Sequence, residues 1–513
     1  MISRHYIGAY SGAPMSILAP TVAAPFEKFK EKTRFHIGTW SVRRHFALMA
    51  LSALLFVVMH AVFTPTRVAQ GDSQQYLALA QTLTDHNVFA YSKEEARPGA
   101  LAGREPLYPA LLAALSRLET ALHAPAYVCS VPLGAGCENA APLLSTLNAI
   151  LFALGALAIA GTIMALGGPM WAAWLACGYV LLNFQAAHDI SCVMSDYLAM
   201  ALAAAFTLTA ALAMRWRRGA AWILPGLAVG LLTLTKVSFL YFGLAGLLVL
   251  TGGGAIALFR FKTWRPLAVA LALAVGFLPP VAGWTIRNGI VLGHYTVSEG
   301  RASESIGYRV AFNDLSARQI AAGFVHWTRG FGDKLYYVLF EPEAIAPFDW
   351  SKPGNFYETV GNSIHRKVIE TTEAHGGDLR GGENEVTGQF LAEIRSRPLK
   401  HLATTTLFVY RGLWVDEFIL VGLPLLLIVV WQALRHWQWE LLILLSPGLY
   451  GMLFYSFFTL NIPRYQLTSM PTLAVGAALG AMYLLAGYRQ RRLAHSPAGD
   501  NALTRGRAGL LWT

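Results

Sequence analysis

The sequence predicts an all-α, polytopic membrane protein, and three observations lead to this prediction. Of the 513 residues, 55% are hydrophobic and only 13% are charged, whereas about 25% of the residues of soluble proteins are charged. Apolar runs of about 20 residues recur along the chain, and a helix of that length spans the hydrocarbon core of a bilayer. Arginine and lysine gather between these runs, where they set the orientation of membrane helices.

The net charge of +11 is compatible with a nucleic-acid partner, but the basic residues lie at the ends of apolar runs rather than on a polar domain. The sequence has no zinc-finger spacing, Walker loop or dinucleotide fingerprint. We therefore expect the lipid bilayer, and no nucleic acid, among the partners of this chain.

The N-terminal segment, residues 1–45, predicts which way the first helix crosses. It carries a basic cluster at 28–34 and the pair Arg43-Arg44 just before the first apolar run. Positive charge is retained in the cytoplasm, and the short apolar stretch at 16–25 lacks the basic flank of a signal peptide. We expect an uncleaved first span whose far end lies outside the cytoplasm.

About ten spans follow if successive apolar runs cross in alternating directions. Every strongly basic short loop then lies on the cytoplasmic side, which supports the count. The predicted spans are residues 46–64, 141–166, 169–187, 197–214, 220–235, 238–259, 267–286, 418–434, 441–460 and 467–487.

Two more helices are expected to lie on the outer membrane surface rather than to cross it. The apolar stretch 106–122 contains Arg117 and Glu119, and if it crossed, every later basic loop would face outward. The stretch 73–84 has apolar residues at helical spacing, and Asp72 precedes it in a position to cap the helix.

These spans divide the chain into segments. The membrane helices of 46–286, with a first external loop at 65–140, precede a polar, aromatic-rich external segment of mixed structure at 287–401. Further membrane helices at 402–487 and a cytoplasmic tail at 488–513 complete the order. In the first loop, Cys129 and Cys137 form either a disulfide or two free thiols, while Cys177 and Cys192 are interpreted as structural.

Charged residues gather at the outer face in this topology. Taken singly, each has a structural explanation, such as a helix cap or a side chain that reaches toward lipid headgroups. Together they suit an anionic lipid-linked substrate, because guanidinium and ammonium groups bind phosphate and a carboxylate can accept a proton. The residues are Asp72, Arg104, Glu105, Asp189, Asp196, Lys236, Arg287 and Arg464.

Short motifs over 46–487 occur in an order that resembles a known family. They are Gly71-Asp72-Ser73-Gln74-Gln75-Tyr76, Arg104-Glu105-Pro106-Leu107-Tyr108-Pro109, Ser195-Asp196-Tyr197-Leu198, Leu234-Thr235-Lys236, Arg287-Asn288 and Pro463-Arg464-Tyr465. This order resembles the GT-C glycosyltransferases that use polyprenyl-phosphate sugars, of families 39 and 83. That group includes protein O-mannosyltransferase-like bacterial proteins and the aminoarabinose transferase of lipid A.

The resemblance implies roles for individual residues. Asp72 matches the essential acid of the first external loop, and Asp196 matches a second acid of the site. Residues matching cations around the donor phosphate are Lys236, Arg287, Arg464 and Arg104. Residues expected to line the substrate are Tyr76, Glu105, Tyr108 and Tyr465. Many relatives carry a second acid where this chain has Ser73, so no cofactor is firmly implied; a divalent metal ion, if bound, would be held by Asp72, Asp196 and His188.

The function implied is inverting transfer of a sugar from polyprenyl (undecaprenyl) phosphate to a hydroxyl of a lipid, glycan or protein acceptor. It would take place on the periplasmic side of a bacterial inner membrane. A lipid-linked polysaccharide ligase or polymerase is an alternative, to which Arg309, Arg329 and His326 would contribute. A secondary transporter is another, although transporters place polar groups near the midplane of repeated halves. A non-catalytic scaffold leaves the outer acids unexplained.

Overall fold

The structure is a computed structural model that describes residues 42–63, 72–91, 103–121, 128–129, 137–138, 142–351 and 353–494. Within these residues the chain is helical, and the only strands are the two-residue pair β1 (Val128–Cys129) and β2 (Cys137–Glu138). Cys129 and Cys137 occupy opposite positions of that antiparallel pair. A disulfide between them stays a prediction.

Seven segments are long and apolar enough to cross a membrane. They are α2 (Val42–Phe63), α5 (Pro142–Ala165), α7 (Asp196–Trp216), α9 (Ser238–Phe261), α10 (Arg265–Leu292), α19 (Trp439–Phe458) and, preceded by the 3-10 turn η3 (Pro463–Ser469), α20 (Met470–Ala494).

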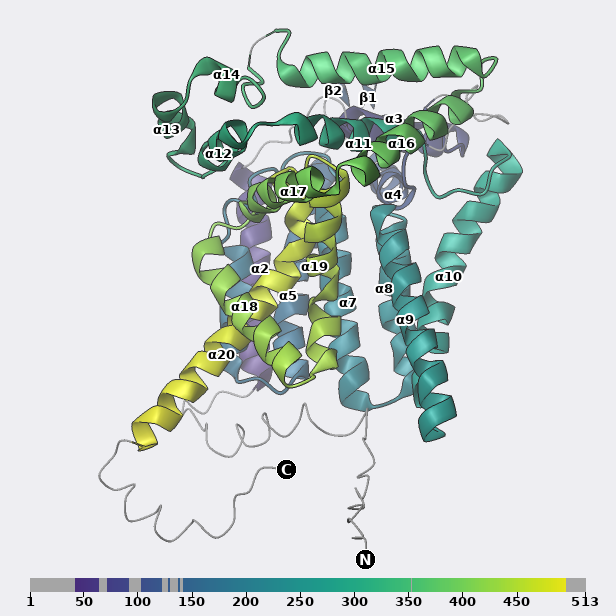
Figure 1. Cartoon of the computed structure of the whole chain (residues 1–513). Coiled ribbons are helices and arrows are strands. Elements are labelled where there is room, and N and C mark those ends of the chain that lie inside the picture. Colours follow the sequence, from purple (N-terminus) through teal and green to yellow (C-terminus); the bar gives the residue numbers. More distant parts are fainter. Residues whose placement is uncertain are drawn as a thin grey trace, which may run out of the picture.

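Three shorter apolar helices belong to the same bundle: two of them are labelled in Figure 1, and the third packs on α5 and α20. They are α6 (Met170–Leu181), α8 (Ile223–Thr233), which follows the turn η1 (Gly219–Trp222), and α18 (Ile419–Arg435). The bundle therefore coincides with the ten predicted spans, and the prediction of an all-α polytopic membrane protein is confirmed.

A second layer of helices lies across one end of the bundle (Figure 1). Both predicted surface helices are in it, as α3 (Asp72–His86) and α4 (Leu107–Ala121), which pack on each other. The other members are α11 (Ala302–Ala311), the turn η2 (Phe312–Asp314), α12 (Ala317–His326), α13 (Gly332–Leu339), α14 (Pro342–Ile345), α15 (Phe356–Ala374), α16 (Leu379–Ser396) and α17 (Pro398–Leu413). The segment 287–401, which we expected to be mixed, is thus made of helices and turns.

Helix packing separates a central group from an outer one. In α5, α7 and the η3–α20 segment, roughly two thirds of the apolar window is buried, whereas in α2 the buried share is 11%. The exposed Leu, Val and Phe side chains of α2 and α9 suit contact with lipid tails. Small residues allow the closest approach, between α8 and α10: a Cβ at Gly226 would lie 2.2 Å from the Leu273 carbonyl oxygen.

Arg309 of α11 connects the second layer to the bundle through hydrogen bonds. Its side chain is fully buried and donates to the carbonyl oxygens of Ser456 in α19 and His401 in α17, each at 2.8 Å. It also donates to the Thr405 hydroxyl at 2.7 Å and to Asn313 at 3.2 Å. Because all four donor contacts reach neutral oxygens of three different elements, Arg309 serves as a structural tie and is not free to bind a substrate.

Candidate active site

Asp72, the first residue of α3, binds three arginines that come from distant parts of the chain. Its Oδ1 atom accepts a charge-assisted hydrogen bond from Arg104 and lies 3.5 Å from Nη2 of Arg301. Its Oδ2 atom accepts from Nη2 of Arg464 at 2.8 Å. A carboxylate at a helix N-terminus is also favoured by the helix dipole, which helps to keep Asp72 ionised.

Arg104 is held in place from several sides. Only 3% of its side chain is exposed, and its Nε atom donates to Oε1 of Gln75 at 2.7 Å. The guanidinium lies over the ring of Tyr76, 4.9 Å from the ring centroid. Asp72, Gln75 and Tyr76 are at positions i, i+3 and i+4 of one helix, so a single face of α3 positions this arginine.

The charge around Asp72 controls its protonation. Burial alone would raise the pKa of the carboxyl group, but Arg104, Arg301 and Arg464 outweigh burial and lower it well below its usual range. The Asp72 carboxylate is partly exposed. It is therefore an accessible anion, and a weak base as long as all three arginines contact it.

A second ion pair lies beside the first. Asp196, the first residue of α7, accepts from Nζ of Lys236 at 2.9 Å, and both side chains are mostly buried. Burial disfavours the ammonium form, but Asp196 more than compensates and raises the pKa of Lys236 above its usual value. The ammonium also lies 5.7 Å from the ring centroid of Tyr465.

The two ion pairs belong to one charged cluster, which consists of Asp72, Arg104, Asp196, Lys236, Arg301 and Arg464. The Tyr76 hydroxyl, on α3, is 2.9 Å from Oγ of Ser195, the residue before Asp196. Arg464 interacts electrostatically with both carboxylates. Four cations thus face two carboxylates, and one positive charge remains in excess even when the neighbouring Glu105 is counted.

Glu105 joins three elements at the edge of the charged cluster. One carboxylate oxygen accepts from the Val237 amide at 3.0 Å and from the Ser298 hydroxyl at 3.4 Å. The Leu107 amide donates to the Leu234 carbonyl at 3.0 Å, which fixes the start of α4 against the end of α8. The predicted Arg-Glu-Pro and Thr-Lys motifs are therefore neighbours in space.

Arg287 is a predicted phosphate ligand that the structure does not bring to the charged cluster. Its guanidinium lies over the Trp284 ring, 4.9 Å from the centroid, and donates to Asn288 at 2.9 Å. We expected Arg287 to be one of the cations beside Asp72. Arg301, which sequence reasoning missed, lies there instead. The topology indicated the end of the bundle on which both residues lie, but no motif marks Arg301, because its only link to Asp72 is a contact between distant segments.

Two of the four tyrosine and glutamate residues expected to line the substrate are buried instead. Tyr76 and Tyr108 are almost inaccessible, with their rings 5.2 Å apart in an edge-to-face contact, and Tyr108 also reaches Asn148 at 3.3 Å. Tyr76 contacts the Arg104 guanidinium, and Tyr108 packs on Tyr76, so both rings help to hold this arginine in place. Glu105 and Tyr465 remain partly exposed next to the cations.

The predicted metal ligands do not come together. His188 is exposed and contacts Asp189 at 3.0 Å, while Asp72 and Asp196 are each bound to cations. Among the residues that the structure describes, no group of three His, Cys, Asp or Glu side chains could hold a metal ion. The physical reason is that arginine and lysine already neutralise both carboxylates.

The residues offered for a polysaccharide ligase are likewise dispersed. Arg309 is the buried tie described above, Arg329 lies 3.7 Å from Glu417, and His326 lies 3.3 Å from Asp333. His326 and Arg329 lie near the end of α12, but they contact different acids, and Arg309 is bound elsewhere, so the described residues show no common site for the three.

No protein-family model matches the sequence, and no curated protein is significantly similar to it. Among solved structures, the chain is similar to the archaeal oligosaccharyltransferase AglB from Archaeoglobus fulgidus, solved in complex with an inhibitory peptide and a dolichol-phosphate. The TM-score is 0.47 at 12% sequence identity, and the match covers 91% of this chain and 52% of the other. The matched region thus spans about half the length of AglB, and a likeness at this score does not assign an activity to this chain.

Proposed function

We propose that this chain is a membrane glycosyltransferase that moves a sugar from polyprenyl phosphate to an acceptor hydroxyl. The observation that carries the proposal is the charged cluster: an accessible carboxylate surrounded by arginines, with positive charge in excess, at one end of a membrane bundle. We place this end on the periplasmic side of a bacterial inner membrane, because the basic loops lie at the other end.

The cations would bind the donor phosphate. A guanidinium group can donate two parallel hydrogen bonds to the oxygens of a phosphate. Arg104, Arg301 and Arg464 all contact the same carboxylate, Asp72, so they could contact one phosphate group together. Lys236 lies next to them and adds a further charge. A polyprenyl tail would remain among the apolar helices while its headgroup meets the charged cluster.

The transfer would be a single displacement that inverts the anomeric centre. The acceptor hydroxyl oxygen attacks the anomeric carbon and forms the new C–O bond. The bond from that carbon to the phosphate oxygen breaks, and its electron pair leaves with polyprenyl phosphate. The hydroxyl proton passes to the Asp72 carboxylate, and the transition state has the oxocarbenium character usual for glycosyl chemistry.

The donor would switch Asp72 from a structural anion to a base. With three arginines on it, the pKa of Asp72 is too low for efficient proton transfer. A phosphate group that takes over hydrogen bonds from Arg104 and Arg464 removes those contacts from the carboxylate and raises its pKa. The same arginines then stabilise the charge that builds on the leaving phosphate, an effect typically worth about a hundredfold or more in rate. Asp196 would keep Lys236 in position for this role.

Retention of undecaprenyl phosphate tests the binding half of the proposal. Native mass spectrometry of the protein released from nanodiscs would compare the unaltered chain with the double variant Arg104→Gln, Arg464→Gln. We expect the double variant to retain the lipid at least about tenfold less, since each lost charge-assisted contact is worth roughly 1.5 kcal/mol or more.

Arg287→Gln is the matched control, because Arg287 lies at the same end of the bundle without joining the charged cluster. It should leave retention unchanged. Equal retention by the double variant, or an equal loss in the control, would refute the assignment of the donor site.

Asp72→Asn tests the chemical half. We expect this variant to insert normally and to bind undecaprenyl phosphate at least as well as the unaltered chain, because a competing anion is gone. It should transfer no sugar. The readout is mass spectrometry of cell-envelope glycans in cells that lack the gene and are complemented with either form. Full restoration of the missing sugar by Asp72→Asn would remove Asp72 from the mechanism.

A further inference from the structure

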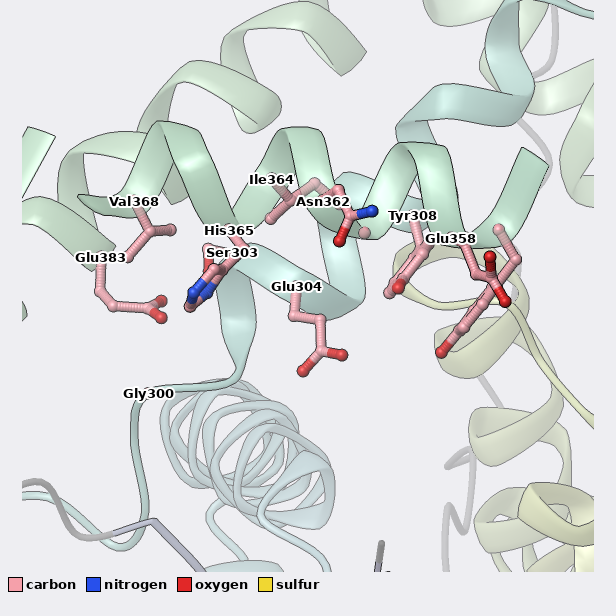
Figure 2. A pocket seen from close by; sticks show the side chains of 12 residues that line it. Gly300, Ser303, Glu304, Tyr308, Glu358, Asn362, Ile364, His365, Val368 and Glu383 are labelled. Atoms are coloured by element: carbon pink, nitrogen blue, oxygen red, sulfur yellow. The ribbon is translucent and has the colours of Figure 1, made fainter. Parts of the chain in front are cut away.

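A cavity of about 560 Å³ lies within the second layer, between α11, α15 and α16 (Figure 2). Its walls carry side chains of Ser303, Glu304 and Tyr308 from α11, Tyr357 and His365 from α15, and Glu383 from α16. Cavities of 300–1,000 Å³ are typical of small-ligand sites. None of the residues considered so far as catalytic lines this cavity.

Two tyrosines of the cavity wall stack on each other. The rings of Tyr308 and Tyr357 are parallel within 2°, with their centroids 4.3 Å apart. Gly361 makes this arrangement possible, because a Cβ atom there would lie 2.2 Å from the Tyr308 hydroxyl. Because the stacked faces contact each other, the pair offers ring edges and hydroxyl groups to the cavity, and these suit a ligand that has both apolar surface and hydroxyl groups.

Several polar groups of the cavity have no protein partner. Ser303 is only 1% exposed, and its hydroxyl makes no hydrogen bond within the described part of the chain. Over the same residues, Glu304, Glu383 and His365 make no hydrogen bond or ion pair. The Ser303 hydroxyl borders the cavity, where it is available to hydrogen-bond a polar ligand.

The cavity adjoins the charged cluster. Gly300 and Ser303, which line it, flank Arg301, the residue 3.5 Å from Asp72. Burial raises the pKa of the Tyr357 hydroxyl, and the negative charges of Glu304 and Asp72 raise it further, so this tyrosine lies within the field of both sites. A molecule in the cavity would therefore be next to the proposed base.

The charge of the cavity is opposite to that of the charged cluster. Glu304, Glu358 and Glu383 contribute three carboxylates, and Glu358 accepts one hydrogen bond, from the Gly354 amide at 2.7 Å. Repulsion would keep a phosphate or a carboxylate out of the cavity, whereas hydroxyl and ammonium groups can donate to these oxygens. The two sites thus suit two different substrates.

We propose that this cavity holds the acceptor as a saccharide without acidic groups, and that a sugar carrying a free amine binds best. The stacked tyrosines contact the sugar with their ring edges, and Ser303 and the glutamates accept its hydroxyl and ammonium hydrogens. Arg301 lies on the side toward the donor. This inference rests on the proposed function, which it deepens by naming the class of acceptor.

Three trisaccharides of similar size test the proposal: the β-1,4 trimers of glucosamine (cationic) and N-acetylglucosamine (neutral), and the trimer of galacturonic acid (anionic). Their dissociation constants would be measured by calorimetry on the full chain in nanodiscs. We expect the cationic trimer to bind at least threefold tighter than the neutral one, and the anionic trimer to bind weakest.

The variant Glu304→Gln, Glu383→Gln should remove the preference for the cationic trimer, and Tyr357→Ala should weaken binding of the cationic and neutral trimers alike. Glu370→Gln, on the exposed side of α15, is the matched control and should change nothing. Anionic trimer binding as tight as the others, no measurable binding of any trimer, or a preference that survives the double glutamine variant, would overturn the inference. Undecaprenyl phosphate retention, measured on the same samples, reports on the proposed function separately.

Discussion

Asp72 is surrounded by more positive charge than one carboxylate can neutralise, and this excess defines its chemistry. Arg104 is locked by Gln75 and Tyr76, whereas Arg301 is partly exposed and lies 3.5 Å away. The two arginines therefore differ in role. Arg104 holds the Asp72 carboxylate in position, and Arg301, on the side of the cavity, lowers the pKa of that carboxylate further.

The pH dependence of kcat/KM should reflect this arrangement. The arginines favour the ionised carboxylate, so their stabilisation of Asp72 is fully present above the ordinary pKa of about 3.9 and is lost only as the pH falls through the lowered pKa of the folded protein. Removing Arg301 raises that pKa toward its ordinary value. We expect the activity of Arg301→Ala to decline at a higher pH on the acid side than that of the unaltered chain.

The measurement is kcat/KM for both forms over a pH range that extends well below the ordinary pKa of an aspartate, because kcat/KM reports the pKa of the free enzyme. Arg318→Ala, which removes an exposed arginine paired with Glu341, should not shift the profile. An acid limb at the same pH in all three forms would show that Asp72 does not control it.

At the same scale, the sequence predicted which residues share an end of the bundle but not which of them touch. Alternation of the spans put Asp72, Asp196, Lys236 and Arg464 on one side, and the structure brings these four together. Span counting does not determine how a helix is rotated about its axis. Arg287 therefore turned out to contact Trp284, outside the charged cluster.

At the scale of elements, the helices that carry the site depend on small residues at their crossings. A Cβ at Gly276 of α10 would lie 2.1 Å from the Ile223 carbonyl oxygen and 2.6 Å from the Leu227 amide nitrogen, both in α8. Both neighbours are backbone atoms, which cannot rotate away. This contact holds α8, and through it Lys236, against α10.

Gly276→Ala should therefore destabilise the bundle by about 1–3 kcal/mol, the usual effect of overpacking a close contact. Gly283→Ala is the control on the same helix, because a Cβ at Gly283 meets nothing within 4 Å. Thermal unfolding of the purified variants in one detergent would show a lower Tm for Gly276→Ala alone. Equal Tm values would mean that the two helices separate without penalty.

Sequence patterns predicted some elements better than others. Hydropathy could not tell whether 106–122 crosses the membrane; the basic loops decided it, and α4 indeed lies across the end of the bundle. The segment 287–401 was harder, because its short helices mix aromatic and charged residues without long apolar runs. Their packing against one another, such as Phe312 on Phe356 at 5.1 Å, is non-local and left no periodic signature.

At the scale of the whole molecule, the two ends of the bundle carry different structures and different charges. One end carries the second layer with the charged cluster and the cavity, and the other carries the basic segments after α7, α9 and α18 (Figure 1). The positive-inside tendency places the basic end in the cytoplasm. The proposed site then faces the compartment in which lipid-linked sugars would meet an acceptor.

Cysteine labelling tests this orientation. The parent chain for labelling carries Cys129→Ser and Cys137→Ser, and its remaining Cys177 and Cys192 are buried. Ser363→Cys on α15 and Lys262→Cys after α9 then introduce thiols at exposed positions of opposite ends. We expect a membrane-impermeant maleimide to label Ser363→Cys in intact spheroplasts and Lys262→Cys only in inverted vesicles, with the unsubstituted chain as background. The reverse pattern would place the charged cluster in the cytoplasm and contradict the proposed location.

The long separation between Asp72 and Arg464 has a consequence for biosynthesis. The two residues are 392 positions apart, whereas Arg104 follows Asp72 after 32. While the chain is being threaded into the bilayer, Asp72 meets Arg104 early, but the last arginine arrives only when α19 has been inserted and η3 emerges. The charged cluster of a nascent protein would therefore stay incomplete until almost the last helix has been made. Partly synthesised molecules should be unable to bind the polyprenyl phosphate donor.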